Sequence, residues 1–249
     1  MLSPYGLNII ESCIKCKLRS DRTFCDLPGS ALQAFEDIKV ATVYPKDAIL
    51  FVEGQAPRGI FALCKGQVKL SVCAQDGKTL IVRIVQPGEV LGLGATVSGK
   101  VYELTAETIE PCQVSFVKRE DFLRFLKQHT EACFKVAEHL SEKYHGACVE
   151  LRTLGLSHSA GEKLAKLLLE LSSTNAEATK QARNLGLSLS HEEMAQMIGT
   201  SRETVSRLFA EMRQRKILQG NGLKLVIRNK AALKLIATAE HTVNGEKTN

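Results

Sequence analysis

The sequence predicts an α+β fold in which an N-terminal antiparallel β jelly-roll barrel is joined by a long helix to a C-terminal winged helix-turn-helix. Three observations support this prediction. Short apolar stretches separated by glycines fill the first half, an apolar heptad repeat follows, and two short amphipathic helices flank Gly199 near the end. The 249 residues are enough for two domains, each with its own core.

The barrel is predicted for residues 31–118. Glycines fall between its apolar stretches at strand-plus-turn spacing, and Asp76-Gly77 is a strong hairpin signal. The stretches expected as strands of the barrel are 48–52, 60–63, 68–72, 80–85 and 114–117.

Residues 1–30 carry little apolar periodicity, so this cysteine-containing segment is too polar to fold alone and something must hold it down.

From Arg119 the spacing of apolar residues becomes helical, and one long helix is predicted for residues 119–156. Its apolar a and d positions form a seam over about four heptads. The seam can pack on the barrel of the same chain, but one barrel cannot cover its whole length. We therefore expect a homodimer, with an interface formed by Cys133, Ala137, Leu140, Tyr144, Ala147, Leu151 and Leu154.

The helix-turn-helix belongs to a predicted domain at residues 157–240, which a polar tail follows at 241–249. Gly199 permits a sharp turn between the two helices, and Thr200 or Ser201 can cap the second helix. Apolar residues at 217–218 and 223–227 flank Gly220-Asn221-Gly222, which indicates a β-hairpin wing.

The first turns of the second helix are expected to present polar side chains away from the core. Arginine, glutamate and serine are residue types that read base edges in the major groove of double-stranded DNA. Residues 201–216 also carry five Lys and Arg against two Glu, which suits a position close to phosphates. The predicted DNA-binding residues are Thr200, Ser201, Arg202, Glu203, Ser206 and Arg207.

Charge and composition narrow the function further. Residues 157–249 carry 14 Lys and Arg against nine Asp and Glu, whereas the rest of the chain is nearly balanced at 19 against 18. The basic excess therefore lies with the helix pair, which favours a nucleic-acid partner. A membrane span, a signal peptide and common catalytic motifs are absent, so we expect a cytoplasmic protein that is not an enzyme. A sensory module whose output is a protein contact is the alternative.

Together, these features resemble the family of the cyclic-AMP receptor and the fumarate–nitrate regulator (CRP/FNR), which are bacterial transcription factors. Arg202-Glu203-x-x-x-Arg207 is similar to the recognition tip of the first branch, and Glu203-x-x-Ser206-Arg207 is similar to the E-x-x-S-R signature of the second. The resemblance implies a cyclic-nucleotide-binding-like barrel, dimeric binding to inverted repeats whose half-sites share a TGA core, and RNA polymerase as a partner.

The sequence departs from the cyclic-AMP binders at the residues that hold the cyclic phosphate. Gly92-Leu93 stands at the Gly-Glu position of that branch, and Tyr102-Glu103 stands near its arginine position. The chain has no arginine between Arg83 and Arg119, so a buried phosphate would lack a cationic partner. We therefore do not expect a cyclic nucleotide as the effector.

The cysteines resemble those of the oxygen-sensing FNR-like branch, which holds a [4Fe-4S] cluster. The segment Glu107-Thr108-x-x-x-Cys112 is similar to the one that carries the central ligand of that branch, and the resemblance assigns Cys13, Cys16, Cys25 and Cys112 as ligands. The spacing between Cys16 and Cys25 is wider than is common there. The expected signal is oxygen, another redox change or nitric oxide. Zinc in the same thiolates, a thiol switch at Cys13 and Cys16, a small molecule in the barrel and a purely structural Cys112 are the alternatives.

Overall fold

The computed structural model of the chain describes residues 5–16, 24–156, 159–176, 189–220 and 225–238. The chain divides into two compact units, residues 1–147 and 148–249. This division falls inside the long helix, nine residues before the boundary expected at 156. Within the described ranges, no helix combines the length and the apolar character that crossing a membrane requires.

The first unit contains two four-stranded antiparallel sheets, with the strand orders β1-β8-β3-β6 and β2-β7-β4-β5. All five predicted strands are present, so the jelly-roll prediction is confirmed. The bounds are β1 (Val40–Tyr44), β2 (Ile49–Phe51), β3 (Gly59–Lys65), β4 (Val68–Cys73), β5 (Thr79–Val85), β6 (Val90–Leu91), β7 (Thr105–Thr108) and β8 (Cys112–Lys118).

The space between the two sheets is filled by apolar side chains from both of them, because successive residues on a strand face opposite sides. Tyr102 stands at the centre of this core and is 1 % exposed. Its ring stacks on Phe51 at a centroid distance of 4.1 Å, and its hydroxyl donates to the carbonyl of Gly59 at 2.9 Å. The interior of the barrel is therefore occupied by its own aromatic side chains.

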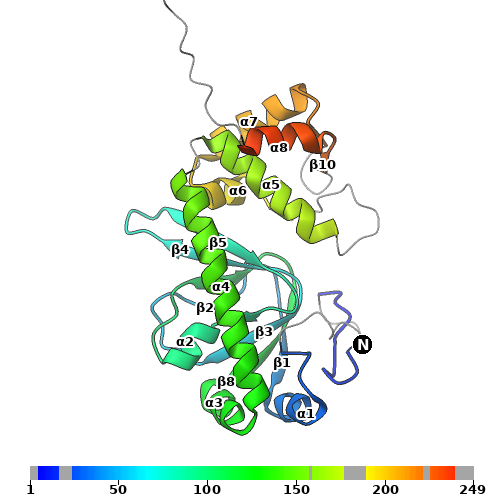
Figure 1. The fold of residues 1–249 in the computed structure, drawn as a ribbon, viewed down its shortest axis with the longest axis vertical. Helices are drawn as coiled ribbons and strands as arrows, with labels where there is room; N and C mark the ends of the chain where they lie inside the picture. The colour runs from blue at the N-terminus through cyan, green and yellow to red at the C-terminus, as the bar shows by residue number, and fades with distance from the viewer. Residues whose placement is uncertain (1–4, 17–23, 157–158, 177–188, 221–224, 239–249) are drawn as a thin grey trace, which may run out of the picture. The chain divides into compact units, whose positions relative to one another are not determined.

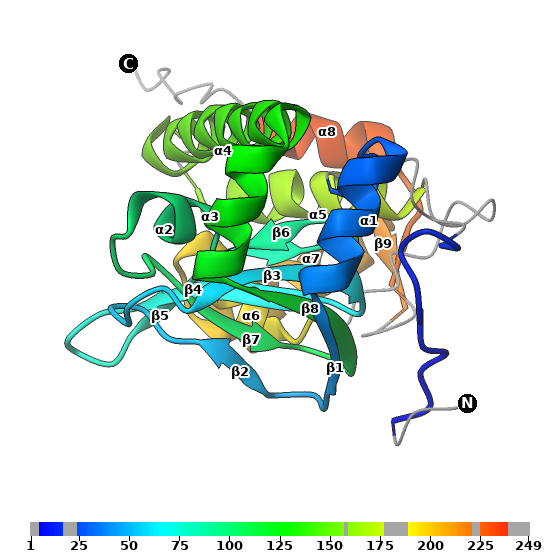
Figure 2. The ribbon, with the colours of Figure 1, turned by 90° about the horizontal axis from the view of Figure 1, so that it is seen from below.

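Helices cover the other face of the sheet that contains β3 and β8 (Figure 2). The predicted helix at 119–156 is in fact two helices, α3 (Arg119–Gln128) and α4 (Thr130–Leu156), because His129 between them has an extended backbone. Leu126, which lies one heptad before Cys133, is on α3 and is buried in the core. The remaining helices of this unit are α1 (Gly29–Ile38), which the sequence did not predict, and α2 (Leu93–Ser98).

One stripe of α4 contacts the barrel through Ala132, Val136 and His139, which are all buried. Near its end, the Lys143 ammonium and the Arg83 guanidinium both pair with the Glu89 carboxylate in the turn between β5 and β6. Burial, reinforced by the positive charge of Lys143, lowers the pKa of His139 from 6.5 to about 4. The stripe therefore places a neutral histidine between the helix and the barrel.

This histidine should make stability depend on pH. Between pH 6.5 and 5 the unfolded chain binds a proton at His139 that the folded chain does not, so the free energy of unfolding should fall by about 1.5 kcal/mol as the pH is lowered. Urea unfolding at fixed protein concentration measures this fall. In His139→Gln, which keeps a donor at the same place, most of the fall should disappear. An equal fall in both proteins would show that His139 titrates normally.

The second unit packs helices around an apolar core and carries a short antiparallel hairpin, in which Leu218 pairs with Ile227. This hairpin confirms the predicted wing, although its turn at 221–224 lies outside the described residues. Figure 1 shows the elements, whose bounds are α5 (Ala160–Ala176), α6 (His191–Ile198), α7 (Arg202–Gln214), β9 (Leu218–Gln219), β10 (Val226–Ile227) and α8 (Lys230–Thr238).

Candidate functional site

The helix-turn-helix is formed by α6 and α7, and local sequence explains both starts. Ser190 and Glu193 form a reciprocal capping box at the start of α6. Ser201 caps α7 by accepting a hydrogen bond from the Thr204 amide at 3.2 Å. Gly199 between them has a φ of +65°, in the left-handed region that favours glycine. The predicted turn glycine and the cap at Ser201 are both confirmed.

Helix α7 has one apolar side and one polar, exposed side. Val205, Phe209 and Met212 are buried against the rest of the unit. Arg202, Glu203 and Arg207 are exposed in the first turns of the helix. Hydrogen bonds from its own backbone amide and from Ser201 hold the pKa of Glu203 below its usual range, so this side chain is an acceptor at neutral pH. The tip therefore offers two guanidinium groups and one carboxylate to a partner.

Two of the predicted DNA-binding residues, Ser206 and Thr200, do not belong to this exposed tip. Ser206 is half-buried, and its hydroxyl lies 2.9 Å from Nδ1 of His191 on α6, so it links the two helices instead of facing outward. Thr200 is half-buried in the turn, where its amide donates to the carbonyl of Ala195. The DNA contact of Ser206 stays a prediction, and its bond to His191 was not foreseen because helical spacing alone does not show which neighbour a hydroxyl meets.

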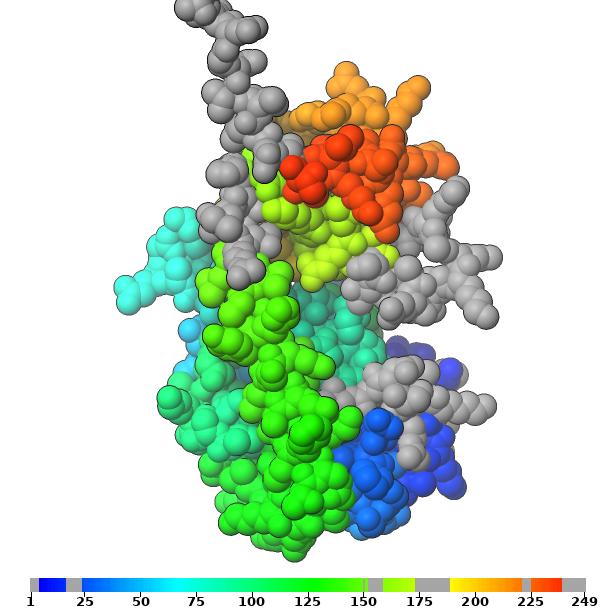
Figure 3. All heavy atoms as spheres, in the orientation of Figure 1, coloured from blue at the N-terminus to red at the C-terminus, as the bar shows by residue number. Residues whose placement is uncertain are grey.

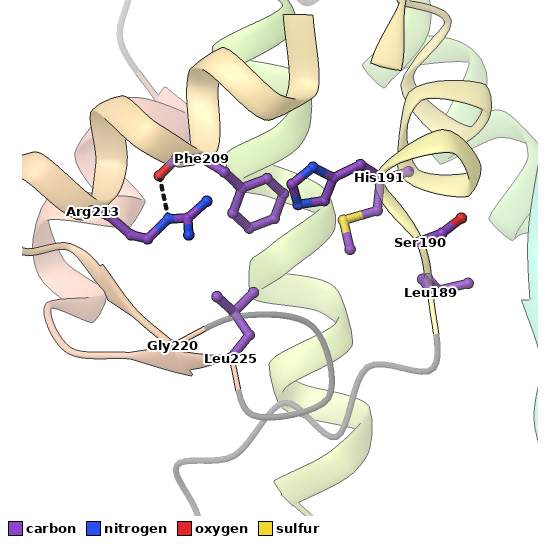
Figure 4. Close-up of a pocket in the computed structure, with 8 residues that line it drawn as sticks. Leu189, Ser190, His191, Phe209, Arg213, Gly220 and Leu225 are labelled. Carbon is purple, nitrogen blue, oxygen red and sulfur yellow. Dashed lines mark hydrogen bonds between the residues drawn. The ribbon is translucent and has the colours of Figure 1, made fainter. Parts of the chain in front are cut away.

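His191 joins this interface through its ring, which stacks on Phe209 at 4.7 Å with an interplanar angle of 6° (Figure 4). Burial and the nearby Arg213 and Arg202 lower the pKa of His191, so the ring is neutral where it stacks. Beside it lies a cavity of about 420 Å³ between the helix pair and the wing. Its lining is formed by Leu189, Ser190, His191, Met194, Phe209, Arg213, Gly220 and Leu225.

The predicted interface on α4 is exposed. Within the first unit, this predicted interface lies on the side of α4 that faces away from the barrel. Figure 3 shows α4 along the surface of that unit. Leu140, Tyr144 and Leu151 have exposed fractions of 36 %, 74 % and 70 %, high values for large apolar side chains. Cys133, Ala137 and Ala147 are exposed on the same side. The side chain of Leu154 lies outside the described residues.

The N-terminal segment is held by apolar contacts. Phe24 is 2 % exposed and stacks on Phe35 of α1, and its edge meets Phe122 of α3. Leu27 and Cys13 belong to the same buried cluster. What holds the described part of this segment is therefore its own few apolar side chains, which reach into the helical layer.

Cys13 lies in a polar niche within this cluster. Its sulfur is 3.0 Å from the Lys39 ammonium, and its amide donates to the Glu36 carboxylate at 2.9 Å. A hydrogen bond from Cys25, supported by Lys39, lowers the pKa of the Cys13 thiol to about 7 against the opposing effect of burial. Lys39 and Glu36 were missed by the sequence analysis, since an ordinary lysine–glutamate pair at a helix end carries no signal of a thiol partner.

Cys112 has the opposite environment. Its side chain is fully buried between the sheets, where the thiol donates to the carbonyls of Gln67 and Glu110 at 3.2 Å each. Burial and the Glu110 charge raise its pKa to about 12. The backbone of Gly66, with a φ of +84°, comes so close that an added Cβ would lie 2.5 Å from the Cys112 sulfur.

These surroundings test the predicted [4Fe-4S] ligand set. The next residue, Gln113, exchanges two hydrogen bonds with the backbone of Ile10, so the N-terminal segment lies along the other face of β8. Cys112 therefore points into the core between the sheets, whereas Cys13 belongs to the cluster under the helices, and the Gly66 backbone lies against the Cys112 sulfur. Among the residues that the structure describes, no three His, Cys, Asp or Glu side chains gather as metal ligands. The four cysteines do not fit a cubane cluster in this arrangement.

A jelly-roll barrel, a long helix with an apolar seam and a winged helix-turn-helix with a charged tip define a class of DNA-binding transcription regulators. Residues 41–129 match the family model described as the cyclic nucleotide-binding domain, and residues 162–236 match the Crp-like helix-turn-helix domain. The chain belongs to the CRP/FNR family of transcription factors and is a DNA-binding transcriptional regulator.

Several relatives align over most of their length. The cAMP-activated global transcriptional regulator CRP of Pasteurella multocida is 22% identical over 185 residues, which cover 74% of this chain and 88% of the relative. The global nitrogen regulator of Synechocystis is 25% identical over 198 residues, which cover 78% of this chain and 87% of the relative. The transcriptional activatory protein AadR of Rhodopseudomonas palustris is 26% identical over 204 residues, covering 82% and 83%.

Solved structures share the fold. FixK2 of Bradyrhizobium japonicum superposes with a TM-score of 0.72 at 24% identity, covering 82% of this chain and 100% of that chain. The c-di-GMP responsive regulator CLP of Xanthomonas campestris superposes with a TM-score of 0.70 at 17% identity, covering 81% and 100%. The names of these proteins refer to different signals, so membership of the family does not identify the signal of this chain.

Proposed function

We propose that the protein binds inverted repeats in double-stranded DNA as a homodimer and that α7 reads the major groove of each half-site. The observation that carries this proposal is the exposed tip of α7, where Arg202, Glu203 and Arg207 stand opposite a buried apolar side. Arginine can donate two hydrogen bonds to guanine, and glutamate can accept from the amino group of cytosine. The half-buried Ser206 positions α7 on α6 in this proposal.

The dimer is proposed to form through the exposed side of α4. The same helix contacts its own barrel through Ala132, Val136 and His139, so Leu140 and Tyr144 of the seam face away from that barrel. A second copy offers the same seam, and two such helices pair around a two-fold axis. Two α7 helices related by that axis match an inverted repeat.

RNA polymerase is the proposed partner of the bound dimer, and the cytoplasm is the proposed location.

The barrel is proposed to act without a cyclic nucleotide. Tyr102 fills its interior, and a Cβ added at Gly92 would lie 2.8 Å from the Tyr102 ring. Arg83 pairs with Glu89 at 2.7 Å, and residues 84–118 contain no arginine for a cyclic phosphate. Binding a nucleotide here would require displacing a buried aromatic cluster and would leave the phosphate without a cation.

The signal input is proposed to lie at the N-terminal cysteines. The family resemblance assigns oxygen or nitric oxide sensing to a [4Fe-4S] cluster, and the cysteine motif supports that assignment. The enclosed Cys112 does not fit it, so the proposed control rests on Cys13, Cys16 and Cys25 alone. These three cysteines lie in or beside the cluster that contains Val136 of α4, which gives them a physical connection to the dimer helix.

Selection of binding sites from random DNA tests the proposed function. The wild-type protein should enrich a two-fold symmetric sequence, and its affinity for the enriched site should fall steeply as salt is raised. Titration with DNA at two or more salt concentrations gives the slope. Enrichment of no symmetric sequence would contradict the proposed reading, and a flat salt dependence would favour an output through a protein partner.

A further inference from the structure

A polar contact joins the two helices of the helix-turn-helix beside the charged tip of α7. The hydroxyl of Ser206 on α7 lies 2.9 Å from Nδ1 of His191, the first residue of α6. Both residues are half-buried, so water competes only in part for this hydrogen bond. Ser206 directly precedes Arg207, which is exposed at the tip. A directional bond between the helices therefore ends next to a residue of the proposed reading surface.

The ring of His191 makes a second contact with α7. It stacks on Phe209 with the ring centroids 4.7 Å apart and an interplanar angle of 6°, as Figure 4 shows. Ser206 and Phe209 are three residues apart, so they are neighbours on adjacent turns of the helix surface. His191 therefore holds α7 at two points, and a rotation of α7 about its axis would displace both of them.

The backbone of His191 is itself held in place by the start of α6. The hydroxyl of Ser190 accepts from the Glu193 amide at 3.2 Å, and the Ser190 amide donates to the Glu193 carboxylate at 2.7 Å. The Met194 amide donates to the Ser190 carbonyl at 3.0 Å. This capped first turn gives His191 a defined backbone conformation, from which its ring can support α7.

The apolar contacts of α7 are less able to fix its rotation. Val205, Phe209 and Met212 are buried, but the free energy of apolar burial depends on area and has no direction. A hydrogen bond, in contrast, weakens steeply when its angle changes. A rotation of about 10° moves an atom that lies about 5–6 Å from a helix axis by roughly 1 Å, which is enough to weaken a hydrogen bond to a base edge.

We infer that His191 is a positioning residue that sets the rotation of α7 and thereby the base specificity of Glu203 and Arg207, without contacting a base itself. This inference rests on the proposed function, in which those two side chains read the major groove. Loss of the bond to Ser206 lets α7 rotate on its apolar side, so base discrimination falls. Attraction to phosphates is largely kept, because it depends on charge more than on exact orientation.

His191→Phe and Ser206→Ala test this role in the full chain. The first keeps a ring that can stack on Phe209 but removes the ring nitrogens, and the second removes only the hydroxyl. Titration with DNA gives the ratio of the affinities for the enriched site and for a scrambled sequence of the same length. Each variant should lower this ratio about fivefold or more and change the affinity for scrambled DNA by less than about twofold. The double variant should lower the ratio no further, because both changes remove the same contact.

Glu192→Gln is the matched control, since Glu192 is exposed in the same turn of α6 and its substitution should leave the ratio unchanged. An unchanged ratio in His191→Phe, additive losses in the double variant, or equal losses of affinity for both DNAs would overturn the role of His191. A wild type that enriches no symmetric sequence would overturn the proposed function, and the role in specificity with it. Urea unfolding separates these failures, because non-additive shifts of the midpoint in the two single variants and the double variant would still establish the contact between His191 and Ser206.

Discussion

Leu140→Glu should convert the protein to monomers and lower its affinity for an inverted-repeat site by about 100-fold or more. Leu140 is an exposed d position at the middle of the described seam, so in a two-fold dimer it lies close to its own copy. The substitution would bury two like charges without partners, at a cost of about 3–5 kcal/mol for the interface. Analytical ultracentrifugation gives the oligomeric state, and titration with labelled DNA gives the affinity.

Val149→Glu is the matched control for this substitution. Val149 is 49 % exposed on the same helix, but it lies at an f position, away from the seam. This variant should remain dimeric and keep its DNA affinity, although it introduces the same side chain into the same helix. A dimeric Leu140→Glu protein at micromolar concentration would contradict the proposed interface, and so would monomers in both variants.

The spacing of apolar residues predicted those strands and helices that have one buried face and one exposed face. The strands of the barrel and both helices of the helix-turn-helix follow from alternating or 3.6-residue apolar spacing, because burial on one side imposes that spacing. The seam on α4 is a further example, since Leu140 and Tyr144 are exposed on one side while Val136 and His139 are buried on the other. These features depend only on neighbours along one element.

Features that depend on distant neighbours could not be predicted. The break at His129 and helix α1 lack strong local signals, and tertiary packing determines both. The orientation of Cys112 depends on strand parity and on Gly66, a residue 46 positions earlier in the chain. The motif around Cys112 is the same whether its thiol faces the N-terminal segment or the core, so the motif alone could not show which way this thiol faces. The contact between Lys39 and Cys13 likewise joins two separate segments, and the spacing of residues along the sequence cannot reveal it.

Arg207→Ala should remove the preference for guanine at one position of each half-site and leave the other positions of the selected sequence unchanged. Arg207 is exposed one turn beyond Glu203, so both side chains extend from the same side of α7. A guanidinium donates two hydrogen bonds to guanine, and their loss costs about 1–3 kcal/mol, or roughly 5- to 150-fold in discrimination at that base pair. Selection from random DNA with wild type and variant in parallel measures the change.

Arg215→Ala is the control that separates base recognition from the general effect of removing one positive charge. Arg215 follows the last residue of α7, is exposed and pairs with Glu211 at 3.7 Å, so its removal subtracts the same charge far from the tip. We expect it to weaken binding to all sequences alike, if at all, because a charge that contacts only phosphates carries no base preference. Base preference should therefore change in Arg207→Ala alone. An unchanged preference at every position in Arg207→Ala would show that this arginine does not read the sequence, and the reader would then have to be sought at Arg202 and Glu203.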